Sequence, residues 1–299
     1  MNGAAPDAPG AATGGGLAGL RVLDCADQTG TSCGTLLAAL GATVRRAARG
    51  EDLGIGAPES ISGSTGRDGR SHLAKPGDPA PFALVDAVIL TGTPSALASR
   101  GLEPAVLLAR HPHLIVAVIS PFGLDGPRAE WRSCDTVAQA VGGMVWVNGH
   151  ADGPPLRGLG PQAYHCAGLH AALGVVLALH ARWRGAPGQL VDISLQESVC
   201  AALEHVSGRF DERGVVAARQ GTLHWSGAFR AAACRDGLVL LSHLGDWTAL
   251  LEWVKSDGAA ADLTEPGWAD ETRRRVEAGH VFDVLAAWAA RYRVADLLE

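Results

Sequence analysis

The chain has 299 residues, of which 47% are apolar and 19% are charged, and its formal net charge is −6. This length allows one large domain or two of ordinary size, and the composition excludes wholesale disorder. A mildly acidic chain lacks the basic surface of a general nucleic-acid binder, so no nucleic-acid partner is expected. Nearly all of its basic residues are arginines, whose planar guanidinium suits phosphate ligands better than the lysine ammonium does.

The N-terminus shows no sign of export. Residues 1–16 are mostly Ala, Gly and Pro and predict a disordered leader, without the basic start and apolar stretch of a secretory signal. The most apolar run, residues 167–181, is short for a membrane span and contains two histidines. Six scattered cysteines form no CxxC pair, which argues against a zinc knuckle or a disulfide framework. We therefore expect a cytoplasmic protein with no membrane partner.

Strand-like and helix-like segments alternate over the first two thirds of the chain. Short runs rich in apolar residues predict strands at 20–25, 87–90, 114–119 and 189–195, and ATVRRA at 42–47 looks like a further strand after the first helix. Helical spacing of apolar residues predicts helices at 33–42, 95–110, 135–146, 165–184 and 196–210, the second of them as one or two short helices. Residues 48–81 are rich in Gly, Pro and Ser and predict a long loop. Alternation of this kind predicts an α/β fold with a parallel sheet.

The pattern changes after about residue 211. Residues 229–244 predict a β-hairpin that turns at 235–237, and helical stretches follow at 247–254 and 271–292. We therefore expect a large domain at 17–210, followed by a linker and a smaller α+β domain at 211–299.

Two local features are candidate anion sites. The turn DQTGTS at 27–32 lies between a strand and a helix, where backbone amides favour phosphate or carboxylate ligands, but it is neither GxGxxG nor a P-loop. Arg45, Arg46 and Arg49 follow the second strand at its carboxyl end, where open α/β sheets bind ligands. An ordinary turn and a solvated charge cluster remain the alternatives.

Three aspartates and one cysteine–histidine pair are candidates for chemistry. Cys166 and His170 lie four residues apart, but the segment is apolar and no third ligand is near, so no metal site is predicted. A core histidine with a buried thiol is preferred, and a cysteine–histidine nucleophile pair is the alternative. Asp24, Asp135 and Asp192 adjoin apolar segments, where a buried carboxylate needs a partner. Each is a functional group, a helix cap or a satisfied core group, and Asp135, at the start of the predicted helix 135–146, most resembles a cap of that helix.

Several segments, in order, resemble the class III coenzyme A transferase (CaiB/BaiF) family. The matching text is LRVLDC with TGTSCGTLLAALGATVRR, then HPHLIVAVISPFGLDGP, CDTVAQAVGGMVWVNGHADGPPLRG, AGLHAALGVVLALHARWRGAPGQLVDISLQESV and CRDGLVLLSHLGDW. The match covers roughly residues 17–299, and SPFGLDGP, ADGPP and GQLVDISL in this order are its most specific parts.

The resemblance implies a Rossmann-like large domain, a small domain and an intertwined homodimer, with a heterodimer of related chains as the alternative. It implies transfer of coenzyme A (CoA) between an acyl-CoA and a carboxylic acid, with both as substrates and no tightly bound cofactor. An aspartate of the family attacks the thioester, which is covalent catalysis by a carboxylate. Related racemases use a histidine and an aspartate. The identity of the acyl group is left open.

The resemblance also implies a set of CoA-binding residues. Gln28, Thr29 and Gly30 fall in the turn that touches CoA in relatives, and Arg49 and Arg132 fall at basic positions that face it. A planar guanidinium suits phosphate at such positions.

The central position departs from the family, since Tyr164 stands where the catalytic aspartate is expected. A phenol is a poor nucleophile at neutral pH, so His165 or Cys166 would have to act in its place. Cys134 occupies the position of the racemase histidine, and Thr91 occupies the position where the family has an asparagine. Typical members also continue beyond the position matched by residue 299.

Two further hypotheses therefore stand beside an active transferase. The first is a catalytically inactive CoA-binding homologue or partner subunit. The second is a dinucleotide-binding oxidoreductase, against which the lack of GxGxxG after the first strand counts heavily.

Overall fold

The computed structural model describes residues 15–47, 80–203 and 205–298. Arg49, nearly all of the loop expected at 48–81 and most of the leader expected at 1–16 lie outside the described residues. The chain divides into two compact units, one of Met1–Val145 with Arg157–Val215 and one of Trp146–Leu156 with Val216–Glu299. We expected a single boundary at 210/211, whereas in the structure residues 146–156 also belong to the second unit.

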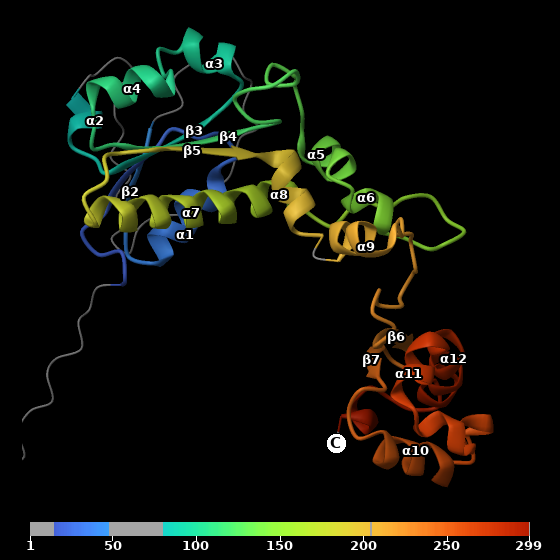
Figure 1. The fold of residues 1–299 in the computed structure, drawn as a ribbon. Coiled ribbons are helices and arrows are strands. Elements are labelled where there is room, and N and C mark those ends of the chain that lie inside the picture. Colours follow the sequence, from blue (N-terminus) through green and yellow to red (C-terminus); the bar gives the residue numbers. More distant parts are fainter. Residues whose placement is uncertain (1–14, 48–79, 204, 299) are drawn as a thin grey trace, which may run out of the picture. The chain divides into compact units, whose positions relative to one another are not determined.

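The first unit is built on a parallel sheet of five strands in the order β2-β1-β3-β4-β5 (Figure 1). All five strands coincide with predicted segments: β1 (Arg21–Asp24), β2 (Thr43–Arg46), β3 (Ala87–Thr91), β4 (Ile115–Ser120) and β5 (Leu190–Ser194). β3 and β4 are buried along their whole length, which explains their continuous apolar sequences. β2 lies on one side of β1, and β3, β4 and β5 lie on the other side. The strand order therefore reverses between β1 and β3, and open α/β sheets bind ligands at such a switch point.

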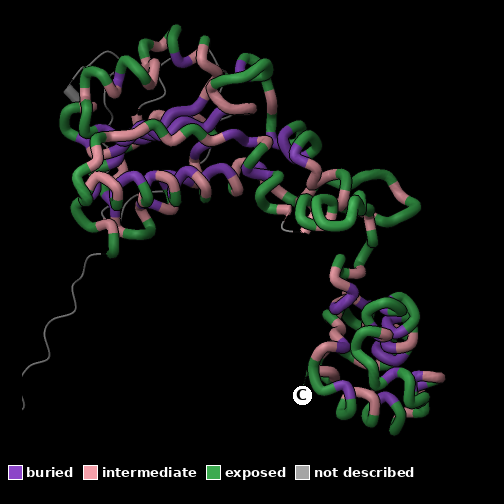
Figure 2. Tube along the Cα trace, viewed as in Figure 1, coloured by how far each residue is buried: buried purple, intermediate pink, exposed green. Residues whose placement is uncertain are grey.

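Helices cover both faces of this sheet. One core joins the sheet to α1 (Thr31–Ala39), α5 (Asp135–Val141), α7 (Gln162–Trp183) and α8 (Leu195–Ala201). A second core joins it to α3 (Pro94–Ser99) and α4 (Pro104–Arg110). Figure 2 shows the buried residues concentrated along the strands and on one side of α7. The remaining helices of this unit are α2 (Ala80–Ala83) and α9 (Val206–Arg213), with α6 (Met144–Val147) at its boundary.

Helix α7 is the long apolar helix of the chain, and among the described residues it alone is long and apolar enough to cross a membrane. In the structure it packs along α1 and against β4 and β5. Its buried side is made of small residues such as Ala163, Ala167 and Ala171, which let α1 approach closely. This packing is that of a core helix of an α/β domain.

Three predicted helices are each divided in two. The segment 135–146 forms α5 and α6, because Gly143 between them adopts a left-handed φ of +92° that a helix cannot include. The segment 196–210 forms α8 and α9. The segment 271–292 forms α11 (Glu271–Val276) and α12 (Ala278–Ala289), which part at Glu277 with ψ of 29°. The single helices expected in these places are therefore wrong.

The second unit contains the predicted β-hairpin and a helical layer with its own core. β6 (Phe229–Ala233) and β7 (Leu238–Ser242) pair antiparallel, which confirms the hairpin. The helices are α10 (Trp247–Ser256), α11 and α12, with short 3-10 turns at Ala261–Thr264, Pro266–Ala269 and Ala295–Leu297. Trp268, Phe282 and Trp288 fill the core of this unit. The fold class is thus the expected one, a parallel α/β domain with a separate small antiparallel sheet.

Candidate functional site

The turn after β1 is held in one conformation by hydrogen bonds from both sides. The Asp27 N–H donates to Thr91 Oγ1 at 3.0 Å, and Asp27 Oδ1 accepts from the Thr29 N–H at 2.8 Å. Gly30 then caps α1, and a Cβ at this position would lie 2.6 Å from the Cβ of Ala26. The predicted CoA-binding residues Gln28, Thr29 and Gly30 therefore form a fixed turn at the switch point of the sheet.

An ion pair between a buried aspartate and a partly exposed arginine supports this turn from within the sheet. Asp24 is 4% exposed, its Oδ2 lies 3.4 Å from Arg46 Nη2, and its Oδ1 accepts from the Ala26 N–H. Arg46 Nη2 also donates to Thr31 Oγ1 at 3.0 Å, at the start of α1. Asp24 is thus a satisfied core carboxylate, and Arg46 holds the helix start rather than standing as a solvated charge.

Asp135 connects α5 to the start of α7. Its side chain is buried; Oδ1 accepts from the Ala163 N–H at 2.9 Å and Oδ2 accepts from Gln139 Nε2 at 2.6 Å. Its own N–H donates to Tyr164 Oη at 3.1 Å. The carboxylate therefore caps a helix distant in sequence and sets the position of Tyr164.

Tyr164 and Cys166 both lie in surroundings that keep them protonated. Burial raises the pKa of the Tyr164 phenol, and this effect outweighs the hydrogen bond from the Asp135 N–H. Burial, followed by the charge of Asp135, also raises the pKa of the Cys166 thiol. At neutral pH neither group supplies an anionic nucleophile.

His165, the middle residue of this segment, points in another direction. Its Nδ1 lies 2.8 Å from Ser32 Oγ, on the second residue of α1. The sequence placed Ser32 in the turn at 27–32 but offered no reason to pair it with His165, because the two residues lie 133 positions apart. A serine in the first turn of a helix that follows a candidate ligand-binding turn was the one available signal.

The remaining predicted residues that the structure describes include Arg132 and Asp192. Arg132 is exposed in the loop before α5, three residues before Asp135. Asp192 accepts from the Leu124 N–H at 2.9 Å, and burial raises the pKa of its carboxyl. Among the predicted residues that are described, His165 contacts the start of α1 at Ser32, two residues after the turn at 28–30, where α1 packs on α7.

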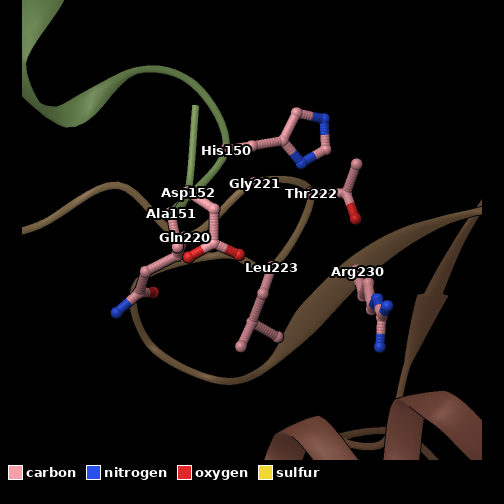
Figure 3. Close-up of a pocket in the computed structure, with 8 residues that line it drawn as sticks. All are labelled: His150, Ala151, Asp152, Gln220, Gly221, Thr222, Leu223 and Arg230. Atoms are coloured by element: carbon pink, nitrogen blue, oxygen red, sulfur yellow. The ribbon is translucent and has the colours of Figure 1, made fainter. Parts of the chain in front are cut away.

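A pocket of about 330 Å³ lies in the second unit, and Figure 3 shows its lining. His150 and Asp152 come from the excursion 146–156, whereas Thr222 and Arg230 come from the segment around the hairpin. None of the predicted site residues lines it. Arg230 is paired with Asp283, at 2.6 Å, so the arginine among the lining residues is already engaged by a carboxylate.

Thiol labelling tests the packing at the start of α1. Burial raises the pKa of Cys33 to about 12, with the charge of Asp24 as a second cause, whereas Cys134 is exposed. Because a thiol with a raised pKa stays protonated, iodoacetamide at pH 8 is expected to alkylate Cys134 but not Cys33 in the folded chain, and both in denaturant. Peptide mass spectrometry reads out each site. Labelling of Cys33 at the rate of Cys134 in the folded chain would contradict this packing.

Comparisons with known proteins agree on one family. The model of CoA-transferase family III matches residues 82–299. A succinyl-CoA:mesaconate CoA-transferase of Haloarcula marismortui is 30% identical over 95% of this chain and 78% of its own length. The succinyl-CoA:(R)-benzylsuccinate CoA-transferase subunit BbsE of Thauera aromatica is 29% identical over 65% of this chain and 49% of its own.

A solved structure shares the fold. The crystal structure of a CAIB/BAIF family protein from Brucella suis aligns with a TM-score of 0.76 and 23% sequence identity, covering 96% of this chain and 81% of that one. In sequence, this chain spans about half the length of several curated relatives, 49% of the Thauera subunit and 54% of a succinyl-CoA–D-citramalate CoA-transferase from Chloroflexus aurantiacus.

Proposed function

Because the chain belongs to CoA-transferase family III, we propose that it transfers CoA from an acyl-CoA thioester to a carboxylic acid. The observation that carries this proposal is the family match over residues 82–299, supported by relatives whose names all describe CoA transfer.

The names of the relatives also suggest where to look for substrates. Succinyl-CoA is the donor in three of them, with (R)-benzylsuccinate, D-citramalate and mesaconate as the partner acids. These acids all carry two carboxylates, of which one forms the thioester. We therefore propose succinyl-CoA as the first donor to test and small dicarboxylates as the first acceptors.

CoA would bind at the turn of residues 28–30, at the start of α1. The fixed backbone of this turn and the first N–H groups of the helix favour an anionic group. Arg132 would supply a mobile guanidinium for the phosphates, because it is exposed. Tyr164 would act as a neutral wall of the acyl site, since its oxygen already accepts from the Asp135 N–H.

The assembly is proposed from the family resemblance, and the location from the six scattered cysteines, which form no CxxC pair. We infer a dimer, either of two copies or with a related chain, in the cytoplasm. Light scattering on the purified chain, alone and after co-expression with a related transferase chain from its host, measures the assembly directly.

The test of function is formation of a new thioester. The purified chain is incubated with succinyl-CoA and each of mesaconate, citramalate, benzylsuccinate, glutarate and oxalate, and products are separated by liquid chromatography and identified by mass. The proposal expects at least one new acyl-CoA, formed at a rate proportional to protein. CoA binding by calorimetry without exchange for any donor and acid would favour the inactive homologue. Absence of both binding and exchange would overturn the proposal.

A further inference from the structure

We propose that Ser32 and His165 form a nucleophile and base pair that cleaves acyl-CoA thioesters, which gives this chain an acyl-CoA hydrolase activity. The inference rests on the proposed function only in that acyl-CoA binds at the turn next to Ser32. It adds a reaction in which water, rather than an acid, accepts the acyl group.

The pair is created by the packing of two helices. Ser32 Oγ and His165 Nδ1 lie 2.8 Å apart, which is the distance of a serine hydroxyl hydrogen-bonded to its general base. The contact depends on Gly168, one turn along α7, because a Cβ there would lie 2.6 Å from the Cβ of Ser32. The close approach of α1 and α7 therefore fixes the serine against the histidine.

The pair lies at the place where the chemistry is expected. Gly30 belongs to the turn proposed to bind CoA, and Ser32 lies two residues after it. His165 directly follows Tyr164. His165 is exposed and Ser32 is partly buried, so a thioester in solution can reach both. The helix cap Gly30 offers no side-chain acceptor, and the Cys33 N–H donates to the Gly30 oxygen at 3.0 Å. The donors at the start of α1 that face no earlier turn of helix are therefore the N–H groups of Thr31 and Ser32. These N–H groups can stabilise an oxyanion formed at Ser32.

The other nucleophiles nearby are less suited to the reaction. The pKa values of Tyr164 and Cys166 are raised by burial, and that of Cys33 reaches about 12. Each of these groups therefore stays protonated at neutral pH. A serine needs no lowered pKa, because a histidine removes its proton as the bond to carbon forms.

The reaction balances without any further reagent. Ser32 Oγ bonds to the thioester carbonyl carbon while its proton passes to His165 Nδ1. The carbon–sulfur bond then breaks, and the CoA sulfur takes that proton and leaves as the free thiol. Water attacks the resulting serine ester and gives its proton to His165, which returns it to Ser32 Oγ as the carboxylic acid leaves. The sum is acyl-CoA plus water giving acid plus CoA.

The experiment measures CoA release and the acyl-enzyme together. Wild-type chain, Ser32→Ala and His165→Gln are each mixed with succinyl-CoA and, separately, acetyl-CoA, and free CoA is followed by thiol colorimetry. Samples quenched in acid are digested to find an acyl mass on the peptide that contains Ser32. Thr35→Ala on α1 and His180→Gln on α7 are matched controls, because both residues are exposed on the same helices.

The expected result is an acyl group on Ser32 in the wild type and a loss of about 100-fold or more in CoA release for both site variants. The two controls keep the wild-type rate, and CoA affinity by calorimetry stays unchanged in all variants, which shows that they fold and bind. Wild-type CoA release by Ser32→Ala, or CoA binding with no acyl group on Ser32, overturns the inference. Thioester exchange that persists in Ser32→Ala while its CoA release stays at the wild-type rate leaves the transfer proposal standing and overturns this one; no CoA binding ends both.

Discussion

Replacing Gly168 by alanine is expected to lower the free energy of unfolding by about 1–3 kcal/mol, the usual cost of overpacking a core. The added Cβ would lie 2.6 Å from the Cβ of Ser32 and 2.9 Å from the backbone nitrogen of Cys33. Because the second of these atoms belongs to the backbone, α1 has to move away from α7. Urea denaturation followed by circular dichroism measures the loss. The movement also separates Ser32 from His165, so CoA release falls together with stability.

Gly208→Ala is the matched control for this change. Gly208 lies inside α9, and a Cβ added there would have nothing within 4 Å, so alanine gains helix propensity without overlap. That variant is expected to be as stable as the wild type or more stable, by up to about 1 kcal/mol. Equal stability of the Gly168 and Gly208 variants would show that α1 and α7 do not pack as closely as the structure has them.

Asp135→Ala is expected to cost about 1.5–3 kcal/mol, the range for hydrogen bonds to a charged group. The change removes the acceptor of the Ala163 N–H at the start of α7, and it removes the shorter of the two hydrogen bonds that the Gln139 amide donates, the other being to the Gly160 oxygen at 3.4 Å. Asp135→Asn retains one oxygen for the Ala163 N–H and is expected to lose less. Denaturant titration at pH 7 gives both values.

Asp211→Ala controls for loss of a carboxylate, because Asp211 is exposed on α9. It is expected to change stability by less than about 0.5 kcal/mol. If Asp135→Ala were no less stable than Asp211→Ala, the hydrogen bonds from Asp135 to the start of α7 would contribute nothing to the free energy of unfolding.

The sheet could be predicted because the amino-acid patterns of its strands, above all β3 and β4, are typical of strands. β3 and β4 are buried on both faces, which leaves continuous apolar runs that no amphipathic helix produces. The hairpin of β6 and β7 was likewise marked by the polar turn at 235–237. The division between α5 and α6 was missed, because Gly143 looks like any helical glycine until its left-handed φ is known.

The site was only partly predictable, for a different physical reason. Asp135 was expected to cap the helix directly after it, but it is the first residue of α5 and its carboxylate instead accepts from the start of α7, which begins 27 residues later at Gln162, so its partners follow from tertiary packing alone. The contact of Ser32 with His165 has the same origin. The roles assigned to Gln28, Thr29, Gly30, Arg49 and Arg132 stay predictions from the family resemblance.

The most direct test of CoA transfer is isotope exchange within one acid. The chain is incubated with unlabelled succinyl-CoA and carbon-13 succinate, and the mass of the succinyl-CoA that remains is followed with time. Transfer moves CoA to the labelled acid, so labelled succinyl-CoA is expected to accumulate in proportion to protein, whatever the natural acceptor is. Hydrolysis alone releases CoA and leaves the remaining thioester unlabelled. No label in the thioester, for succinyl-CoA or for acetyl-CoA and formyl-CoA with their own labelled acids, would contradict CoA transfer by this chain.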